Sequence, residues 1–245
     1  MTLQVQNLVG GYSQIPILHQ VSFEVHPGEL VGLIGLNGAG KSTTINHLIG
    51  LLHPFSGSIV LNEHDIATDP LGYQQQIAYV PETPILYDEL TLREHIALTI
   101  KAYQLDHDEA WRRATNLLKK FRLDNKLDWF PADFSKGMKQ KVMIVCAFIT
   151  NAQLFIVDEP FYGLDPLAVR DLLDLIEDRK QAGAAVLMST HVLDTAEKYC
   201  DRFVLLNNGR VKFRGTLAEM RQAIDDPQAS LNDIYLNMAK GEQDG

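Results

Sequence analysis

An eight-residue run rich in glycine, Gly35 to Ser42, constrains the fold of this chain more than any other feature. Two glycines separated by four residues are followed at once by lysine and serine, which is the spacing of a loop that cradles phosphate groups. The apolar run 30–34 before it predicts a buried strand, and residues 42–49 after it predict an amphipathic helix. Because strand, loop and helix come in the required order, we interpret the run as a nucleotide phosphate site and not as an ordinary glycine-rich turn.

The residue types of this loop predict separate roles. Glycine lets the backbone adopt positive φ and bring its N–H groups against phosphate oxygens at a helix N-terminus. Lys41 is expected to reach the β- and γ-phosphates, and Ser42 is expected to place its hydroxyl on Mg²⁺. The predicted nucleotide-binding residues of the loop are Gly35, Asn37, Gly38, Ala39, Gly40, Lys41, Ser42 and Thr43.

Predicted strands and helices alternate along much of the remaining chain. Short antiparallel strands are expected at 3–6 and 21–25. Further strands are predicted at 57–61, 77–80, 154–157, 185–188, 203–206 and 210–213, and helices at 91–103, 108–121, 166–182 and 192–199. Asn208-Gly209 predicts a hairpin turn. Such alternation predicts an α/β fold with a mainly parallel sheet, into which residues 90–150 insert a helical segment.

Bulk composition narrows the possible functions. A hydrophobic fraction of 46% over 245 residues supports a full core in one large α/β domain or two small ones. The net charge of −9 and the pI near 5.3 disfavour a nucleic-acid partner, which requires a positive surface. The longest apolar run, 142–149, is far shorter than the ~20 residues of a membrane span. With no leader pattern and two unpaired cysteines, the chain is expected to be cytoplasmic.

A second motif follows at residues 154–159, where an apolar strand ends in Asp158 and Glu159. Two acids at a strand end usually form a solvated turn. Beside a phosphate loop, Asp158 is instead expected to hold Mg²⁺ through water, and Glu159 to polarise the water that attacks the γ-phosphate.

These two motifs, with those that follow, resemble the nucleotide-binding subunit of ABC transporters from about Leu3 to Arg221. The other matching positions are Tyr12, Ser135 and Gly137 of the signature motif, Asp165 of the D-loop and the switch histidine His191. The resemblance implies a P-loop NTPase core with an N-terminal antiparallel β subdomain. It also implies an ABC ATPase domain at 1–222, with a core at about 1–88 and 152–222, a helical subdomain at about 89–151, and a short C-terminal helix and tail at 223–245.

The resemblance also implies roles for these residues. Tyr12, which by itself would be read as a surface aromatic, is expected to stack on adenine. His191, otherwise a residue at a helix entry, is expected to bond the γ-phosphate and to hold the attacking water with Glu159. Two copies are expected to form a homodimer head to tail, in which Ser135 and Gly137 of one copy close the MgATP site of the other.

Three departures from the family pattern stand out. Glu82 replaces the glutamine that usually follows a strand and touches Mg²⁺, and we expect Glu82 to contact the metal and to sense the γ-phosphate. Lys136 and Met138 replace the usual glycine and glutamine of the signature, and Tyr162 replaces a small residue of the D-loop. Lys136 could lie beside a triphosphate or simply in solvent at the start of a helix.

The segments 80–84, 129–141 and 158–166 resemble most the Ecs-type ATPase subunits of Gram-positive bacteria. That resemblance implies an exporter with a separate multi-helix transmembrane permease, which would hold this subunit peripherally on the inner face of the cell membrane. The alternatives are a soluble ABC ATPase that acts on ribosomes or DNA, and a small-molecule kinase. Residues 231–236 could form a helix that packs on this chain or one that docks on a partner.

Overall fold

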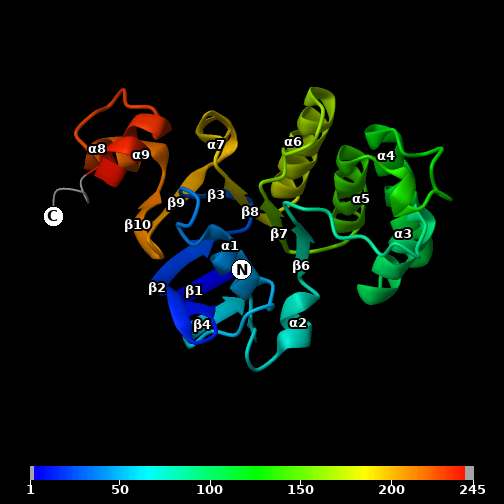
Figure 1. Ribbon diagram of the computed structural model, residues 1–245, viewed down its shortest axis with the longest axis horizontal. Helices are drawn as coiled ribbons and strands as arrows, with labels where there is room; N and C mark the ends of the chain where they lie inside the picture. The colour runs from blue at the N-terminus through cyan, green and yellow to red at the C-terminus, as the bar shows by residue number, and fades with distance from the viewer. Residues whose placement is uncertain (1–2, 241–245) are drawn as a thin grey trace.

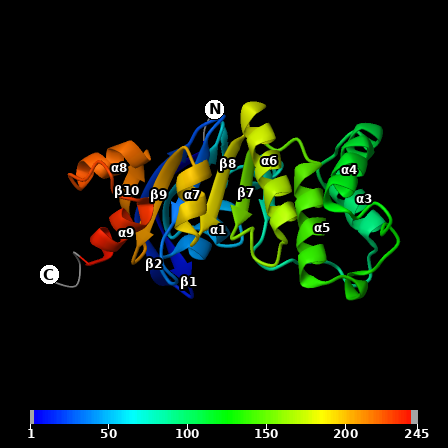
Figure 2. The same ribbon diagram turned by 90° about the horizontal axis from the view of Figure 1, so that it is seen from above.

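The computed structural model describes residues 3–240, which form two β-sheets with helices around them (Figures 1 and 2). The strands are β1 (Leu3–Tyr12), β2 (Ile15–Val25), β3 (Leu30–Ile34), β4 (Ser56–Leu61), β5 (His64–Asp65), β6 (Ile77–Val80), β7 (Leu154–Asp158), β8 (Ala185–Thr190), β9 (Arg202–Asn207) and β10 (Arg210–Gly215). The helices are α1 (Lys41–Leu48), α2 (Pro70–Gln74), α3 (Leu92–Ala102), α4 (His107–Phe121), the 3-10 turn η1 (Pro131–Asp133), α5 (Lys136–Phe148), α6 (Pro166–Gln181), α7 (Leu193–Tyr199), α8 (Leu217–Ala223) and α9 (Leu231–Lys240).

The larger sheet has the strand order β10-β9-β3-β8-β7-β6. The strands from β9 to β6 run parallel, and β10 joins β9 antiparallel through a turn at Asn208 and Gly209, both of which have positive φ. Strands β3, β7 and β8 are buried along their whole length, as expected for parallel strands covered on both faces. The predicted α/β class, the mainly parallel sheet and the hairpin are confirmed.

The register of this sheet brings three strand ends together. Ile34 pairs with Thr190, and Asp158 pairs with Ser189. Because β3, β7 and β8 are parallel, the loops that follow their carboxyl ends share one edge of the sheet. The glycine-rich loop, the two acids and His191 are therefore neighbours in space although up to 156 residues separate them in the chain.

The N-terminal sheet has the order β2-β1-β4-β5 and is antiparallel, as predicted. Its first two strands are 10 and 11 residues long, so the prediction of short strands was wrong. The β1–β2 register shifts between Val5 and Leu8 and again before Gly10, while Asn7 and Gln20 have positive φ. These bulges break the apolar alternation by which a strand is read from sequence.

The helices divide between the two ends of the molecule. Helices α3, α4 and α5 lie together at one end, and α8 and α9 at the other (Figure 1). Helix α1 packs between the two sheets, where Ile45 and Leu48 join one buried cluster with residues of β1 and β8. Thr91 caps α3, and α4 begins at His107 because Asp106 caps it. The domain boundaries at residues 88 and 152 stay a prediction.

The C-terminal segment packs on its own chain. Leu231 and Ile234 of α9 are buried in one cluster with Ile34 of β3 and Ala196 of α7. Residues 231–236 are thus helical and engaged within this chain. The end of the predicted tail, residues 241–245, lies outside the described residues.

Candidate functional site

The glycine-rich loop between β3 and α1 has the backbone geometry that phosphate binding needs. Gly38 and Gly40 have φ of 84° and 107°, a region that side chains with a Cβ rarely adopt. A Cβ at Gly35 would lie 2.7 Å from the carbonyl oxygen of Leu206. Helix α1 begins directly after Gly40, so its free N–H groups and the positive end of its dipole face the loop.

Neighbouring segments hold the loop in place. Gly209, in the β9–β10 turn, donates its N–H to the carbonyl of Ala39 at 2.9 Å, and the Ala39 N–H reaches the carbonyl of Leu36 at 3.0 Å. The Lys41 ammonium donates to the Gly35 carbonyl at 2.7 Å, which closes the loop from the inside. The loop is therefore already folded around the space in which phosphates would lie.

Lys41 also faces the acids at the end of β7. Its ammonium is 3.9 Å from Oε1 of Glu159, and both side chains are largely buried, with exposures of 8% and 13%. A phosphate that enters the loop meets this ammonium, which can then exchange its carbonyl partner for phosphate oxygens. The predicted closeness of Lys41 to the phosphate site is consistent with this placement.

Glu159 is held by its backbone as well as by its side chain. Its φ is 44°, unusual for a residue with a Cβ, and its N–H donates to the carbonyl and to the hydroxyl of Ser189, at 3.1 and 3.0 Å. The carboxylate turns toward His191, whose Nδ1 lies 2.7 Å and whose backbone N lies 3.2 Å from Oε2. Since a carboxylate only accepts hydrogen bonds, Nδ1 of His191 carries a proton and is the donor in this contact.

Asp158 is buried at the end of β7 and accepts a hydrogen bond from the Ser189 hydroxyl. Burial raises the pKa of its carboxyl group, and the nearby carboxylates of Glu82 and Glu159 raise it further, although Ser189 and Lys41 act in the opposite direction. Burial and the Asp158 charge together raise the pKa of Tyr79. The site thus concentrates negative charge where a divalent cation would relieve it.

This donor set fits Mg²⁺ carried by a nucleotide. Mg²⁺ usually takes one or two protein carboxylates and completes its shell with phosphates and water. Within residues 3–240 the His, Cys, Asp and Glu side chains form no group of three that could hold a metal alone. Asp158, Ser42 and Glu82 are the residues that would hold the ion, and Glu82 lies exposed after β6, close enough to act on the Asp158 charge.

Replacing Asp158 with asparagine is expected to stabilise the nucleotide-free protein at pH 7 by about 0.5–2 kcal/mol, because asparagine removes a charge that the fold disfavours. The raised pKa means that the folded protein loses stability from this group as the pH rises through that pKa. The gain should therefore vanish below the usual carboxyl range. Urea unfolding at pH 7 and pH 3.5 measures it.

The control for this change is Asp174→Asn on the exposed side of α6. It alters net charge equally without touching the site. An Asp158→Asn protein that is less stable than the parent at pH 7 would contradict the assigned charge clustering.

Tyr12 ends β1 beside helix α1. Its ring is 45% exposed, and its hydroxyl accepts a hydrogen bond from the side chain of Asn46 at 3.1 Å. This bond fixes an open aromatic face next to the helix that begins at the phosphate loop. The placement suits adenine stacking, which stays a prediction.

The signature residues lie at the start of α5, separated from α1 by β7 and α6 (Figures 1 and 2). The Ser135 hydroxyl caps the helix by accepting the N–H of Met138 at 3.3 Å. A Cβ added to Gly137 would overlap the carbonyl oxygen of Gly163 in the D-loop. Within one chain, the structure therefore joins the signature to the D-loop and leaves the phosphate loop apart from both.

Lys136 and Tyr162, two of the residues that depart from the family pattern, contact each other. The Lys136 ammonium lies 3.9 Å from the centre of the Tyr162 ring, a cation–π contact between the signature and the D-loop. Asp165 caps α6 and forms an ion pair with Lys141 of α5 at 2.7 Å, and hydrogen bonding to Lys141 lowers its pKa to about 2. Lys136 is thus engaged with an aromatic ring of its own chain.

Two side chains that the sequence analysis did not single out also shape the site. Ser189 supports both Asp158 and Glu159. Its sequence signal was its place directly after the strand predicted at 185–188, two residues before His191. The buried amide of Gln140 in α5 donates to the carbonyl of Pro81 at 2.9 Å, which connects the signature helix to the loop that carries Glu82.

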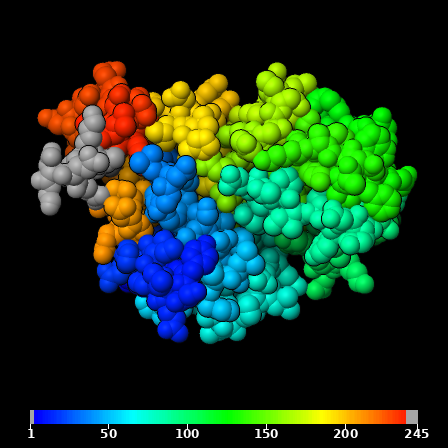
Figure 3. All heavy atoms as spheres, viewed as in Figure 1, coloured from blue at the N-terminus to red at the C-terminus, as the bar shows by residue number. Residues whose placement is uncertain are grey.

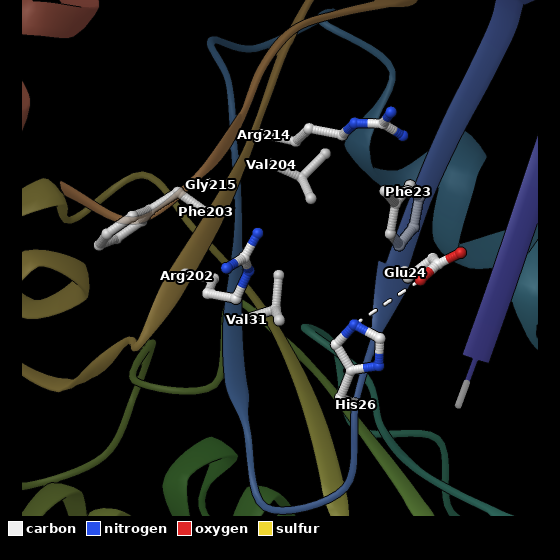
Figure 4. Close-up of a pocket in the computed structure, with 9 residues that line it drawn as sticks. All are labelled: Phe23, Glu24, His26, Val31, Arg202, Phe203, Val204, Arg214 and Gly215. Atoms are coloured by element: carbon white, nitrogen blue, oxygen red, sulfur yellow. Dashed lines mark ion pairs between the residues drawn. The ribbon is translucent and has the colours of Figure 1, made fainter. Parts of the chain in front are cut away.

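A cavity of about 300 Å³ lies at the other end of the larger sheet (Figure 4). Arg202 and Val31 line it and pair across β9 and β3 at the amino end of β3, away from the phosphate loop. Its other polar lining comes from Arg214, His26 and Glu24, the last two at 3.6 Å from each other. Ligands of parallel α/β sheets bind at the carboxyl ends of the strands, so we place the nucleotide site at the phosphate loop and not here.

Comparison with known proteins agrees with this geometry. The family model for ABC transporters matches residues 18–162. The ABC-type transporter ATP-binding protein EcsA of Bacillus subtilis (strain 168) is 56% identical over 238 residues, which cover 97% of this chain and 96% of the relative.

Two solved structures share the fold. An ATP-binding subunit of an ABC transporter superposes with a TM-score of 0.95 at 53% identity, covering 98% of this chain and 100% of that one. A bacterial Atm1-family ABC exporter with ATP bound gives a TM-score of 0.81 at 25% identity, covering 98% of this chain and 41% of that one. The predicted P-loop NTPase core is confirmed, and the chain belongs to the ABC transporter family as an ATP-binding domain, the ATPase unit of that family.

Proposed function

We propose that this protein binds MgATP at the loop 35–43 and hydrolyses it with Glu159 and His191, as one of two copies that power an exporter-type permease. The observation that carries the proposal is the cluster around Glu159 at the carboxyl ends of β3, β7 and β8. There one carboxylate oxygen of Glu159 lies 3.9 Å from the Lys41 ammonium and the other lies 2.7 Å from Nδ1 of His191, beside the folded phosphate loop.

Each residue of the cluster has a chemical task. Lys41 and the N–H groups of the loop bind the phosphates, and Asp158 with Ser42 holds the Mg²⁺ that accompanies them and offsets their charge. Glu159 orients the attacking water and accepts its proton. The hydrogen bond from Nδ1 of His191 fixes the carboxylate, and we propose that Nε2 contacts the γ-phosphate or the attacking water.

Two copies are needed to complete the site. Ser135 and Gly137 lie at the N-terminus of α5, where free N–H groups favour an anion, yet they are remote from the phosphate loop of the same chain. In the head-to-tail pair that we propose, this helix end closes on the γ-phosphate bound by the other copy. Hydrolysis then removes the shared ligand and loosens the pair.

An exposed apolar surface next to the Glu82 loop suits the permease. Ile85 and Tyr87 are 73% and 62% exposed, and Leu98 of α3 is 42% exposed. Trp129 and Phe130, at 39% and 44%, lie on a segment joined to the start of α3 by the N–H of Leu92 and the carbonyl of Trp129. Large apolar side chains gathered on a surface indicate a protein contact.

The partner that we propose supplies the membrane spans. Within residues 3–240 no helix is long and apolar enough to cross a bilayer. The EcsA relative is a transporter ATP-binding protein, and the Atm1-family structure is an exporter. We propose accordingly that this protein is held on the inner face of the cell membrane by a multi-helix exporter permease.

A pull-down from detergent-solubilised membranes tests this proposal. A tagged Glu159→Gln protein with MgATP is used, because it should hold the closed state, and co-purifying proteins are identified by mass spectrometry. A stoichiometric multi-helix membrane protein supports the transporter. Recovery of ribosomal or DNA-bound proteins alone would reject it and favour the soluble alternative.

Replacing Ser135 with arginine is expected to abolish the ATP-dependent pair and to lower hydrolysis at least about tenfold. A single copy should still bind ATP within about threefold of the parent, because Ser135 caps α5, and β7 and α6 separate α5 from α1 in the same chain (Figure 1). Light scattering after size-exclusion chromatography, in the Glu159→Gln background, measures pairing. Ser135→Ala is the matched control, since it loses the helix cap, worth about 0.5–2 kcal/mol, without adding bulk. Pairing retained by Ser135→Arg would contradict the proposed arrangement.

A further inference from the structure

Tyr235 joins the C-terminal helix α9 to the phosphate loop. Its hydroxyl accepts the backbone N–H of Leu36, the second residue of the loop, at 2.8 Å. The Tyr235 side chain is buried, with 5% exposure, although Leu36 is 59% exposed. In the space-filling view, the red C-terminal helix lies beside the blue segment that carries the loop (Figure 3).

Helix α9 is anchored firmly enough to define the position of this hydroxyl. The Leu231 N–H donates to Glu197 of α7 at 2.7 Å, and Glu197 also forms an ion pair with Arg221 of α8 at 3.3 Å. Arg221 donates in turn to the carbonyl of Ala229 at 2.8 Å, just before α9 begins. Ile234 and the Tyr235 ring are both buried in the cluster that contains Ile34 of β3, so packing as well as hydrogen bonding holds this part of α9.

The hydrogen bond to Tyr235 gives the second polar backbone group of Leu36 a partner. The carbonyl of Leu36 already accepts the Ala39 N–H at 3.0 Å and lies 3.5 Å from the Lys41 ammonium. Its N–H has Tyr235 as partner, so both polar groups of Leu36 are held. A loop ordered before the ligand arrives loses less conformational entropy on binding, and the affinity for the ligand rises accordingly.

The same helix borders the space in front of the loop. A cavity of about 520 Å³ is lined by Asn37 of the loop, His191 after β8, and Asn232 and Tyr235 of α9. Helix α9 therefore faces both the phosphate loop and the switch histidine. Burial raises the pKa of the Tyr235 hydroxyl, and the hydrogen bond from Leu36 acts in the opposite direction.

We propose that Tyr235 is a positioning residue of the nucleotide site, through which α9 holds the start of the phosphate loop in its binding conformation. The inference rests on the ATP site proposed above. It assigns to the C-terminal helix a part in ATP affinity, distinct from the residues that touch the nucleotide.

Tyr235→Phe removes the hydroxyl and keeps the ring, and Tyr103→Phe is its matched control. The Tyr103 hydroxyl donates to the carbonyl of Ile77 at 2.6 Å and is partly buried, directly after α3, which lies at the other end of the molecule from α9 (Figure 1). Two measurements are made on parent and variants. One is hydrogen exchange of the Leu36 amide by NMR without nucleotide, and the other is the ATP Kd with the KM and kcat of hydrolysis.

In Tyr235→Phe the Leu36 amide is expected to exchange at least about tenfold faster. ATP Kd and KM should rise about threefold to tenfold, the effect of one lost neutral hydrogen bond, with kcat within about twofold of the parent. Tyr103→Phe should leave the exchange rate and Kd unchanged. Unchanged exchange in Tyr235→Phe, or faster exchange without a change in Kd, overturns the proposal. If the parent itself binds no ATP, the proposed function fails, and the exchange rates still decide whether Tyr235 orders the loop.

Discussion

Replacing Glu159 with glutamine is expected to lower ATP hydrolysis by about 10²–10⁴-fold while ATP binding is retained, which is the range for loss of a positioned proton acceptor. Glutamine keeps the shape of the side chain and can still meet the N–H of His191 through its amide oxygen. It has no basic oxygen to take a proton from water. The bound ATP should then persist, so the protein should elute as a pair in MgATP.

Phosphate release under single-turnover conditions measures the chemical step, and calorimetry measures ATP affinity. The matched control is Glu63→Gln in the exposed turn between β4 and β5, which changes charge equally. Turnover near the parental rate in purified Glu159→Gln protein would remove the assignment of Glu159 as the base. Loss of ATP binding would show instead that the residue acts on the nucleotide.

Replacing Lys41 with alanine is expected to weaken ATP binding by at least about 100-fold, since charge-assisted hydrogen bonds contribute about 1.5–3 kcal/mol each. The change removes the cation expected to bind the phosphates. It also removes the positive charge that offsets the buried Glu159 carboxylate. The nucleotide-free loop should also loosen, because the bond to the Gly35 carbonyl is lost.

Equilibrium binding of a fluorescent ATP analogue measures this loss of affinity. Lys119→Ala, on the exposed side of α4, is the control for charge. An affinity within tenfold of the parent would be incompatible with Lys41 as the main phosphate ligand. Faster exchange of the loop amides in the absence of nucleotide would report the structural role separately.

The sequence alone could predict those parts of the site that local order determines. The loop 35–42 and the acids Asp158 and Glu159 each follow an apolar strand, and parallel strands place their carboxyl ends on one edge of the sheet. His191 follows a third such strand. Spacing, apolar runs and the rule for parallel sheets predicted the loop and the two acids, whereas His191 was assigned from the resemblance to ABC ATPases. The comparisons confirm the family that these motifs indicated.

Contacts between distant segments could not be predicted in this way. Leu36 and Tyr235 are 199 residues apart, and nothing in either segment encodes the bond between them. Lys136 and Tyr162 were two unrelated departures in the sequence, because their pairing depends on how α5 packs beside the D-loop. The full length of β1 could not be predicted for a different reason. Each bulge inserts one residue, so the alternation of apolar and polar side chains changes phase within the strand.

Gly137 at the start of α5 packs so closely against the Gly163 carbonyl that no Cβ would fit between the signature helix and the D-loop. The Lys136–Tyr162 contact and the Lys141–Asp165 ion pair add two further connections between α5 and the D-loop, so we expect a displacement of α5 to move the D-loop with it. Packed interiors transmit such strain because their compressibility is low. A movement of helices α3 to α5 is therefore expected to displace the N-terminus of α6 as well.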